Sequence, residues 1–197
     1  MPICEMPRRG QKPFVFVLWL LPAPPERDFF SGVIKRLARN RNAPIFAPHL
    51  TLGLCRMNPI RPPRIIPSPI RLRVVGISSS SIFTKTLFVR FDSNPGLEEL
   101  RKTLGVNAGD YDPHLSLLYC RLPAGERSRL VRGIKLPFSS VGFDKISVVR
   151  CPSPTENRSE VESWEEWALN KLQFPAVQDH SPAQKNSPGH EKLALED

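Results

Sequence analysis

The chain has 197 residues, of which 40% are hydrophobic and 24% charged, and its formal net charge is +9. This composition excludes a disordered or fibrous chain and fits a globular protein with one moderate domain or two small lobes that share a core. The charge favours anionic partners such as nucleotides, RNA or phosphorylated metabolites, although a basic surface can also serve solubility alone.

The cysteines and the apolar segments exclude further classes. Cys4, Cys55, Cys120 and Cys151 show neither CxxC spacing nor a local histidine cluster, which argues against a zinc site. The first residues do not resemble a secretory signal, and the longest apolar run, 14–21, is too short to span a bilayer. We therefore expect a cytoplasmic protein, with the nucleus as the alternative, that has no membrane contact, metal or cofactor.

The N-terminal half of the chain predicts a strand, a helix and a second strand. Residues 1–12 are expected to form a polar arm, and residues 14–21 are a β-branched and aromatic run that predicts a buried strand. A helix is predicted after Pro24, because apolar residues from Phe29 to Leu37 recur at helical spacing. A second strand is predicted over 46–55.

The rest of the chain follows a similar order. Residues 56–69 combine prolines and arginines and predict a stiff basic connection. The elements predicted next are strands over 70–77 and 86–91, a helix over 95–104, strands over 113–120 and 143–150, and a final helix over 159–172. Residues 173–197 lack any apolar period and are expected to be a disordered tail.

The order strand, helix and histidine-bearing strand occurs twice, and His49 and His114 occupy equivalent places. The repeat is longer than a solenoid unit, so an array of repeats is not expected. The sequence predicts an α+β domain over residues 13–172. Its two pseudo-symmetric lobes, each an antiparallel sheet with outer helices, would face each other across a central cleft.

Each repeat ends on a Pro-His-Leu-Thr/Ser-Leu motif, at residues 48–52 and 113–117. Residues two apart in a strand share one face, so His49 points with Thr51 and His114 points with Ser116. The leucines turn to the opposite, packed face. Two such strands side by side would bring two imidazoles and two hydroxyls into one cleft.

This set of groups suits phosphate ester hydrolysis without a metal. A neutral imidazole can take a proton from water, a protonated one can deliver a proton to the departing oxygen, and hydroxyls can bind phosphate oxygens. A single His-x-Thr arises often by chance, whereas its repetition in one context favours function. We predict His49 and His114 as the catalytic pair and Thr51 and Ser116 as phosphate-binding residues. His180 and His190 lack the pattern and are interpreted as solvated.

On these motifs the chain resembles the 2H phosphoesterase superfamily, which is defined by two His-x-Thr/Ser motifs, and within it the cyclic phosphodiesterases of yeast and plant type. The likeness spans approximately residues 13–172 and includes the segments 17–20, 46–51, 111–119 and 161–164. It implies two antiparallel sheet lobes across a cleft. It also implies hydrolysis of ADP-ribose 1″,2″-cyclic phosphate to the 1″-phosphate and of nucleoside 2′,3′-cyclic phosphates to 2′-phosphates, in the metabolism of tRNA splicing by-products. Which histidine is the acid and which the base stays open.

The resemblance also implies that Tyr119 lines the site. Tyr119 lies five places after His114, so a straight strand would turn it to the other face, and a bulge or the strand end would have to redirect it. Phe83 and Lys85 are candidates for a base-stacking ring and a phosphate contact, or else for packing and a solvated charge.

Other conspicuous residues receive structural interpretations. Trp19 is interpreted as core, and Trp164 and Trp167, one helical turn apart, as docking the final helix. Cys55 and Cys120 occupy equivalent repeat positions, which permits a redox link between the lobes or, as we prefer, two small thiols.

Two alternative functions stay open beside a monomeric small-molecule enzyme. The first is an RNA-end-processing 2H enzyme acting on RNA cyclic phosphates or 2′,5′ linkages, which the basic segment 56–73 favours slightly. The second is a nucleotide- or RNA-binding protein without catalysis, against which the two intact motifs argue.

Overall fold

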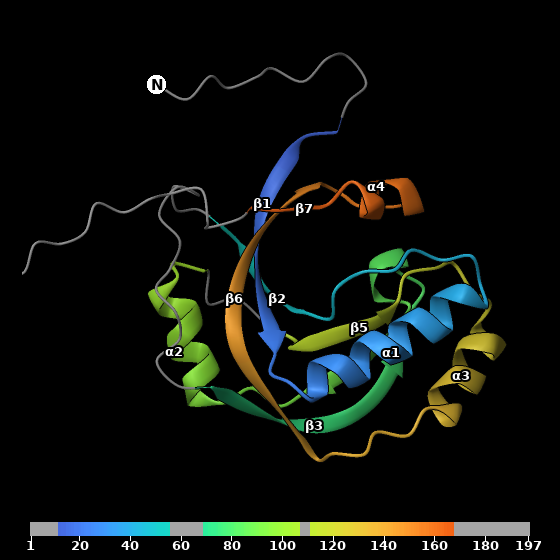
Figure 1. Cartoon of the computed structure of the whole chain (residues 1–197), viewed down its shortest axis with the longest axis horizontal. Coiled ribbons are helices and arrows are strands. Elements are labelled where there is room, and N and C mark those ends of the chain that lie inside the picture. The colour runs from blue at the N-terminus through green and yellow to red at the C-terminus, as the bar shows by residue number, and fades with distance from the viewer. Residues whose placement is uncertain (1–11, 56–68, 107–110, 168–197) are drawn as a thin grey trace, which may run out of the picture.

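The computed structural model describes residues 12–55, 69–106 and 111–167. In chain order the elements are β1 (Phe14–Pro22), α1 (Glu26–Arg39), β2 (Leu50–Leu54), β3 (Ile70–Ser79), the 3-10 turn η1 (Phe83–Lys85), β4 (Leu87–Phe91), α2 (Pro95–Thr103), β5 (His114–Leu118), α3 (Ala124–Gly133), β6 (Ser140–Pro152), α4 (Arg158–Glu162) and β7 (Glu165–Glu166) (Figure 1). The predicted arm over 1–12 except residue 12, the predicted connection over 56–69 except residue 69, and the predicted tail over 173–197 lie outside the described residues.

The strands pair antiparallel throughout and form two equivalent halves. One half contains β6, β1 and β2, and the other contains β3, β4 and β5. The halves are joined where Leu50 of β2 pairs with Leu115 of β5, and again where β3 pairs with the first part of β6. The predicted α+β class with two pseudo-symmetric lobes is confirmed, but the lobes share one continuous sheet.

β1 is buried on both faces, which explains its continuous apolar sequence. Leu18 and Leu20 lie in the main core. The alternate residues face the other way and enter a second cluster with β6, which pairs along the whole length of β1 (Figure 1); its buried members are Val17, Trp19, Leu21, Val149 and Cys151. One strand therefore contributes both to the core and to the floor of the cavity described below.

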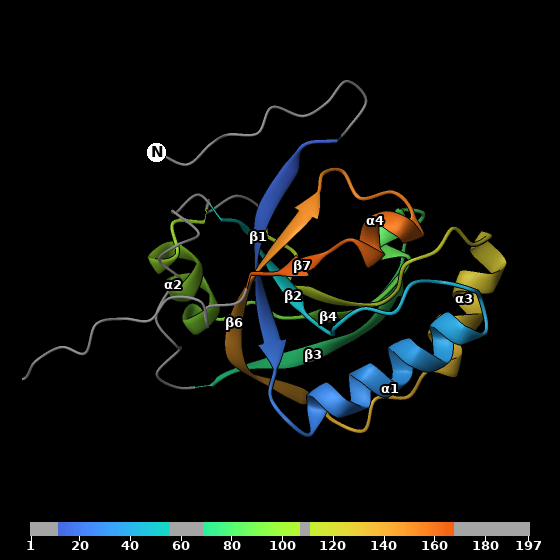
Figure 2. The same cartoon turned by 45° about the horizontal axis from the view of Figure 1, so that its top comes forward.

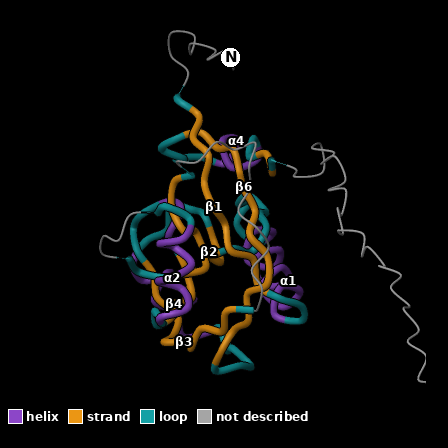
Figure 3. The backbone as a smooth tube through the Cα atoms, turned by 90° about the vertical axis from the view of Figure 1, so that its left-hand side faces the viewer, coloured by secondary structure: helices purple, strands orange, loops and turns teal. Residues whose placement is uncertain are grey.

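The helices pack outside the strands, with α1 and α2 on different sides of them (Figures 1 and 3). α1 buries the apolar stripe that its spacing predicts, including Phe30 and Leu37. α2 begins at Asn94, whose side-chain oxygen accepts a hydrogen bond from the Leu97 backbone N–H at 2.9 Å. α3 was not predicted, because none of its residues is fully buried and its sequence shows no strong apolar stripe.

The predicted final helix over 159–172 is wrong within the described residues. α4 ends at Glu162, and Glu165 and Glu166 form β7, which pairs with β6 (Figure 2). The Ser147 hydroxyl donates to the Glu166 carboxylate at 2.6 Å. Trp164 and Trp167 consequently lie on different surfaces, because Trp164 turns to the cavity while the Trp167 ring contacts Phe16, with 5.4 Å between ring centroids.

Gly53 in β2 occupies a backbone conformation that favours glycine, with φ +148°, and a Cβ atom there would overlap a Val106 methyl. We expect Gly53→Ala to lower the free energy of unfolding by about 1–3 kcal/mol through strain and crowding. Urea denaturation measures this change. Gly32→Ala, in open space on α1, is the matched control and should stabilise by about 0.5–1 kcal/mol. Equal stability of the two variants would contradict the prediction.

Candidate active site

A cavity of about 430 Å³ lies over the strands that carry the two histidines. Its lining includes all four residues of the paired motifs: His49, Thr51, His114 and Ser116. The structure therefore brings both imidazoles and both hydroxyls to one cavity. β1, β6 and the segment 153–155 that follows β6 supply much of the remaining floor and wall.

The alternation within each motif accounts for this placement. Leu50, Leu52, Leu115 and Leu117 are at most 1% exposed and lie in the main core. The residues between them face the cavity, as the period of two along a strand requires. The predicted strand over 46–55 is shorter than expected and begins at Leu50, so His49 stands one residue before β2.

His49 is almost completely enclosed by aromatic rings and is only 4% exposed. Its imidazole stacks on Trp19, with centroids 3.6 Å apart and planes 7° from parallel. The rings of Trp164 and Phe46 approach it edge-on, with centroids at 6.0 Å and 6.1 Å. These contacts fix the ring and separate most of it from solvent.

His114 is half-buried and lies beside charged residues. Its ring meets Phe88 edge-on, with centroids 5.3 Å apart. The nearby Asp112 carboxylate accepts hydrogen bonds from Lys85 Nζ at 2.7 Å and Arg90 Nε at 3.2 Å. Burial opposes ionisation of Asp112, but the bonds and charges of Lys85 and Arg90 hold the pKa of this carboxyl below its usual value.

The two imidazoles are oriented by the same device. His49 Nδ1 donates to the Ala47 carbonyl oxygen and His114 Nδ1 donates to the Asp112 carbonyl oxygen, each at 2.7 Å and each to the residue two places earlier. A carbonyl oxygen can only accept, so Nδ1 carries a hydrogen in both rings. In the neutral form each ring keeps its lone pair on Nε2, which is therefore the atom available for proton transfer.

Burial makes the two histidines unequal. Burial lowers the pKa of His49 to about 4, with a smaller downward contribution from the charge of His114 and an opposing one from the Ala47 hydrogen bond. Burial also lowers the pKa of His114, and Lys85 adds to this, while the Asp112 carbonyl and carboxylate oppose it. Because His49 is the more deeply enclosed ring, a single proton shared by the pair resides on His114.

Hydroxyl groups make hydrogen bonds at or beside the cavity. Ser116 Oγ donates to the Thr84 carbonyl oxygen at 2.9 Å, and Thr84 itself lines the cavity. The Tyr111 hydroxyl donates to the Thr51 carbonyl oxygen at 2.7 Å. This bond connects the segment just before β5 to β2. A phosphate oxygen that enters the cavity would meet hydroxyls from both halves of the fold.

Tyr119 lies in the cavity wall although five places separate it from His114. β5 ends at Leu118, and this end of the strand supplies the redirection that a straight strand would forbid. Tyr119 stacks on Phe46 with centroids 3.9 Å apart, and burial raises the pKa of its phenol while a hydrogen bond with Ser116 opposes the rise.

Phe83 and Lys85 are not among the described residues that line the cavity. Phe83 packs half-buried beside Tyr119, with 6.2 Å between centroids. Lys85 binds Asp112 and lies over the Phe88 ring at 4.7 Å. The structure thus places both next to site residues, where Phe83 packs against an aromatic ring and Lys85 is paired with a carboxylate.

Several residues of the site were not predicted as such. Trp19 is buried, as expected, but it is also the stacking partner of His49. Trp164 reaches the same ring from the segment after α4. Asp112 and Thr84 accept hydrogen bonds from the site through their backbone carbonyls, and no sequence motif reveals such acceptors. Trp19, in contrast, lies on the face of β1 opposite Leu18, and this alternation could have indicated a second packed surface.

The described residues contain no group of three or more His, Cys, Asp or Glu placed to hold a metal ion. No described helix is long and apolar enough to cross a membrane. Cys120 is a free thiol, so the structure does not show a redox link between Cys120 and Cys55.

Fold and cavity together define an α+β protein with a two-histidine site. No family model and no curated protein matches the chain. Among solved structures, it is similar to the E. coli LigT protein, crystallised in complex with phosphate, at 14% sequence identity and a TM-score of 0.45. That match covers 80% of this chain and 96% of LigT.

Proposed function

We propose that this chain is a 2H phosphoesterase that hydrolyses cyclic phosphate esters, with His49 and His114 as a metal-independent acid/base pair. The observation that carries the proposal is the convergence of the pair in one cavity, each imidazole held through Nδ1 by the carbonyl two residues earlier. A structural role for one histidine would not require the same orientation in both halves of the fold.

The proposed reaction is the addition of one water across a P–O bond of the cyclic ester. The neutral imidazole takes a proton through Nε2 as the water oxygen attacks phosphorus. The bond from phosphorus to the opposite ring oxygen breaks, and the protonated imidazole gives its Nε2 proton to that oxygen. When the 3′ oxygen of a nucleoside 2′,3′-cyclic phosphate leaves, the product is the 2′-phosphate.

The remaining groups of the cavity orient the phosphate. The Thr51 and Ser116 hydroxyls bind non-bridging oxygens and hold phosphorus in line with the attacking water. Ser116 can do so when its hydrogen turns from the Thr84 carbonyl to the ligand. When the pair binds one proton, His114 is the ring that takes it and His49 keeps its Nε2 lone pair, because His49 is the more buried ring.

The size of the cavity suits a small cyclic nucleotide. Its volume of about 430 Å³ falls within the range of roughly 300–1,000 Å³ that is usual for small-molecule sites. The proposed substrates are nucleoside 2′,3′-cyclic phosphates and ADP-ribose 1″,2″-cyclic phosphate, as by-products of tRNA splicing in the cytoplasm or nucleus. We propose that the protein acts on them as a monomer.

An assay in EDTA with each of these substrates tests the proposal. We expect turnover without added metal, and we expect phosphorus NMR to identify the nucleoside 2′-phosphate as the product. Turnover that requires a divalent cation would contradict the acid/base pair. Turnover of oligonucleotides alone would identify an RNA-end-processing enzyme, and binding without turnover would identify a nucleotide-binding protein.

A further inference from the structure

The cavity has two chemically different ends. The inner end holds the histidines and hydroxyls described above. The outer end is mainly apolar, and its lining includes Val15 and Val17 of β1, Leu54 of β2, and Pro152 and Pro154. Val15 and Val17 share one face of β1, and they pair with Cys151 and Val149 of β6, which extends the apolar surface away from His49.

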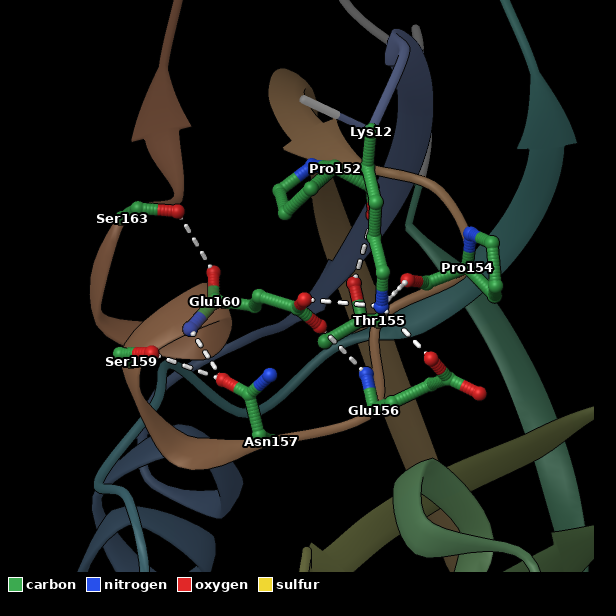
Figure 4. A network of polar contacts seen from close by, with 9 residues as sticks. All are labelled: Lys12, Pro152, Pro154, Thr155, Glu156, Asn157, Ser159, Glu160 and Ser163. Carbon is green, nitrogen blue, oxygen red and sulfur yellow. Dashed lines mark hydrogen bonds and ion pairs between the residues drawn. The ribbon is translucent and has the colours of Figure 1, made fainter. Parts of the chain in front are cut away.

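The rim of this outer end is held by a charged network around Lys12 (Figure 4). Lys12 Nζ donates to the Pro154 carbonyl oxygen at 3.0 Å and lies 2.7 Å from Glu156 Oε2 and 2.8 Å from Glu160 Oε1. The second Glu160 oxygen accepts the Glu156 backbone N–H at 2.6 Å. The rim loop, residues 152–157, is thus tied both to the start of β1 and to α4.

The rim network carries more negative than positive charge. Two carboxylates, Glu156 and Glu160, face one ammonium, so its net charge is −1. Lysine and arginine are absent from the described residues that line the cavity. Arg150, next to Cys151 in β6, lies 3.3 Å from Glu165 and over the Phe14 ring, and it is not among the described lining residues.

We propose that the outer end of the cavity selects substrates whose body beyond the cyclic phosphate is uncharged and apolar, such as a nucleobase, and disfavours a second phosphate. The inference rests on the proposed function and narrows its substrate class. The apolar floor offers contact area to a flat ring. The rim charge repels a terminal phosphate or diphosphate, which finds no cation among the described lining residues. Nucleoside 2′,3′-cyclic phosphates are therefore preferred to ADP-ribose 1″,2″-cyclic phosphate.

Two substrates that differ by one phosphate provide the test. Adenosine 2′,3′-cyclic phosphate and its 5′-phosphorylated form share the base, the sugar and the reacting ester. We expect kcat/KM to be about fivefold higher for the form without the 5′-phosphate, and the ratio to fall as NaCl is raised, because salt screens the rim charge. ADP-ribose 1″,2″-cyclic phosphate should follow the phosphorylated form.

Two rim variants should move this ratio in opposite directions. Lys12→Met makes the rim more negative and should raise the ratio about two- to threefold, whereas Glu156→Gln makes it neutral and should lower the ratio by a similar factor. If the two substitutions acted only by loosening the rim loop, they would change the ratio of kcat/KM values in the same direction. Glu99→Gln, an exposed carboxylate on α2, is the control and should leave the ratio unchanged.

The outcomes separate this inference from the proposed function. Equal kcat/KM for the two adenosine substrates, a preference for the 5′-phosphorylated one, or a shift of both rim variants in one direction would overturn the selection but leave the hydrolase in place. Failure of wild-type protein to turn over any cyclic phosphate would overturn the proposed function itself.

Discussion

Alanine at either His49 or His114 should lower kcat/KM for adenosine 2′,3′-cyclic phosphate by about a thousandfold, because each variant removes one of the two proton transfers in the proposed reaction. The double variant should lose little more than either single one, since residues that act as a unit are not additive. Steady-state assays in EDTA at several pH values measure these effects.

The two variants require different structural controls. His49 is 4% exposed and stacked on Trp19, so its alanine variant opens a cavity and can lose stability as well as activity. His49→Gln retains much of the volume and should be equally inactive. Equilibrium binding of adenosine 2′-phosphate to each variant shows that the cavity persists. His180→Ala, outside the paired motifs, should keep full activity, and full activity in His49→Gln or in His114→Ala would contradict the acid/base pair.

The paired motifs were predictable because they combine local alternation with repetition. A period of two along the strand separates His49 and Thr51 from Leu50 and Leu52, and no long-range information is needed for that separation. The repeat then predicts equivalent halves of the fold. Burial of the motif leucines in one core and exposure of the histidines to one cavity follow from these two observations.

The surroundings of the histidines were less predictable because they depend on contacts between distant segments. Trp19 stacks on His49 only because β1 pairs with β2, with a register shift between Leu18 and Trp19. Trp164 reaches the same ring because β7 pairs with β6 and ends the helix that the spacing of Trp164 and Trp167 suggested. Strand pairings between distant segments cannot be predicted from the local periodicity of the sequence.

The difference between the two imidazoles also depends on tertiary packing. The motifs are nearly identical in sequence, yet aromatic rings enclose His49 while His114 lies beside the Lys85–Asp112 pair. The sequence could therefore indicate a pair of histidines but not which of them holds the proton. The deeper burial of His49 lowers its pKa to about 4 and so favours His114 as the ring that takes a proton.

The burial of His49 should also make the stability of the protein depend on pH. Its pKa is about 4 in the folded state and about 6.5 in an unfolded chain. Between these values the unfolded chain binds more protons, so the free energy of unfolding falls as the pH is lowered from about 6.5 to about 4. The shift corresponds to a loss of about 3 kcal/mol. Urea denaturation at half-unit pH intervals measures it.

His49→Gln should remove most of this pH dependence, whatever its effect on stability at neutral pH, because glutamine does not titrate. His114→Gln is the matched control and should flatten the curve less, since the His114 side chain is only half-buried. The lowered pKa of Asp112 acts in the same direction but at more acidic pH, and both variants retain it. An unchanged slope in His49→Gln would show that His49 is accessible to protons in the folded protein. The same enclosure that costs stability in acid keeps the His49 lone pair free at neutral pH, as a base that takes a proton from water requires.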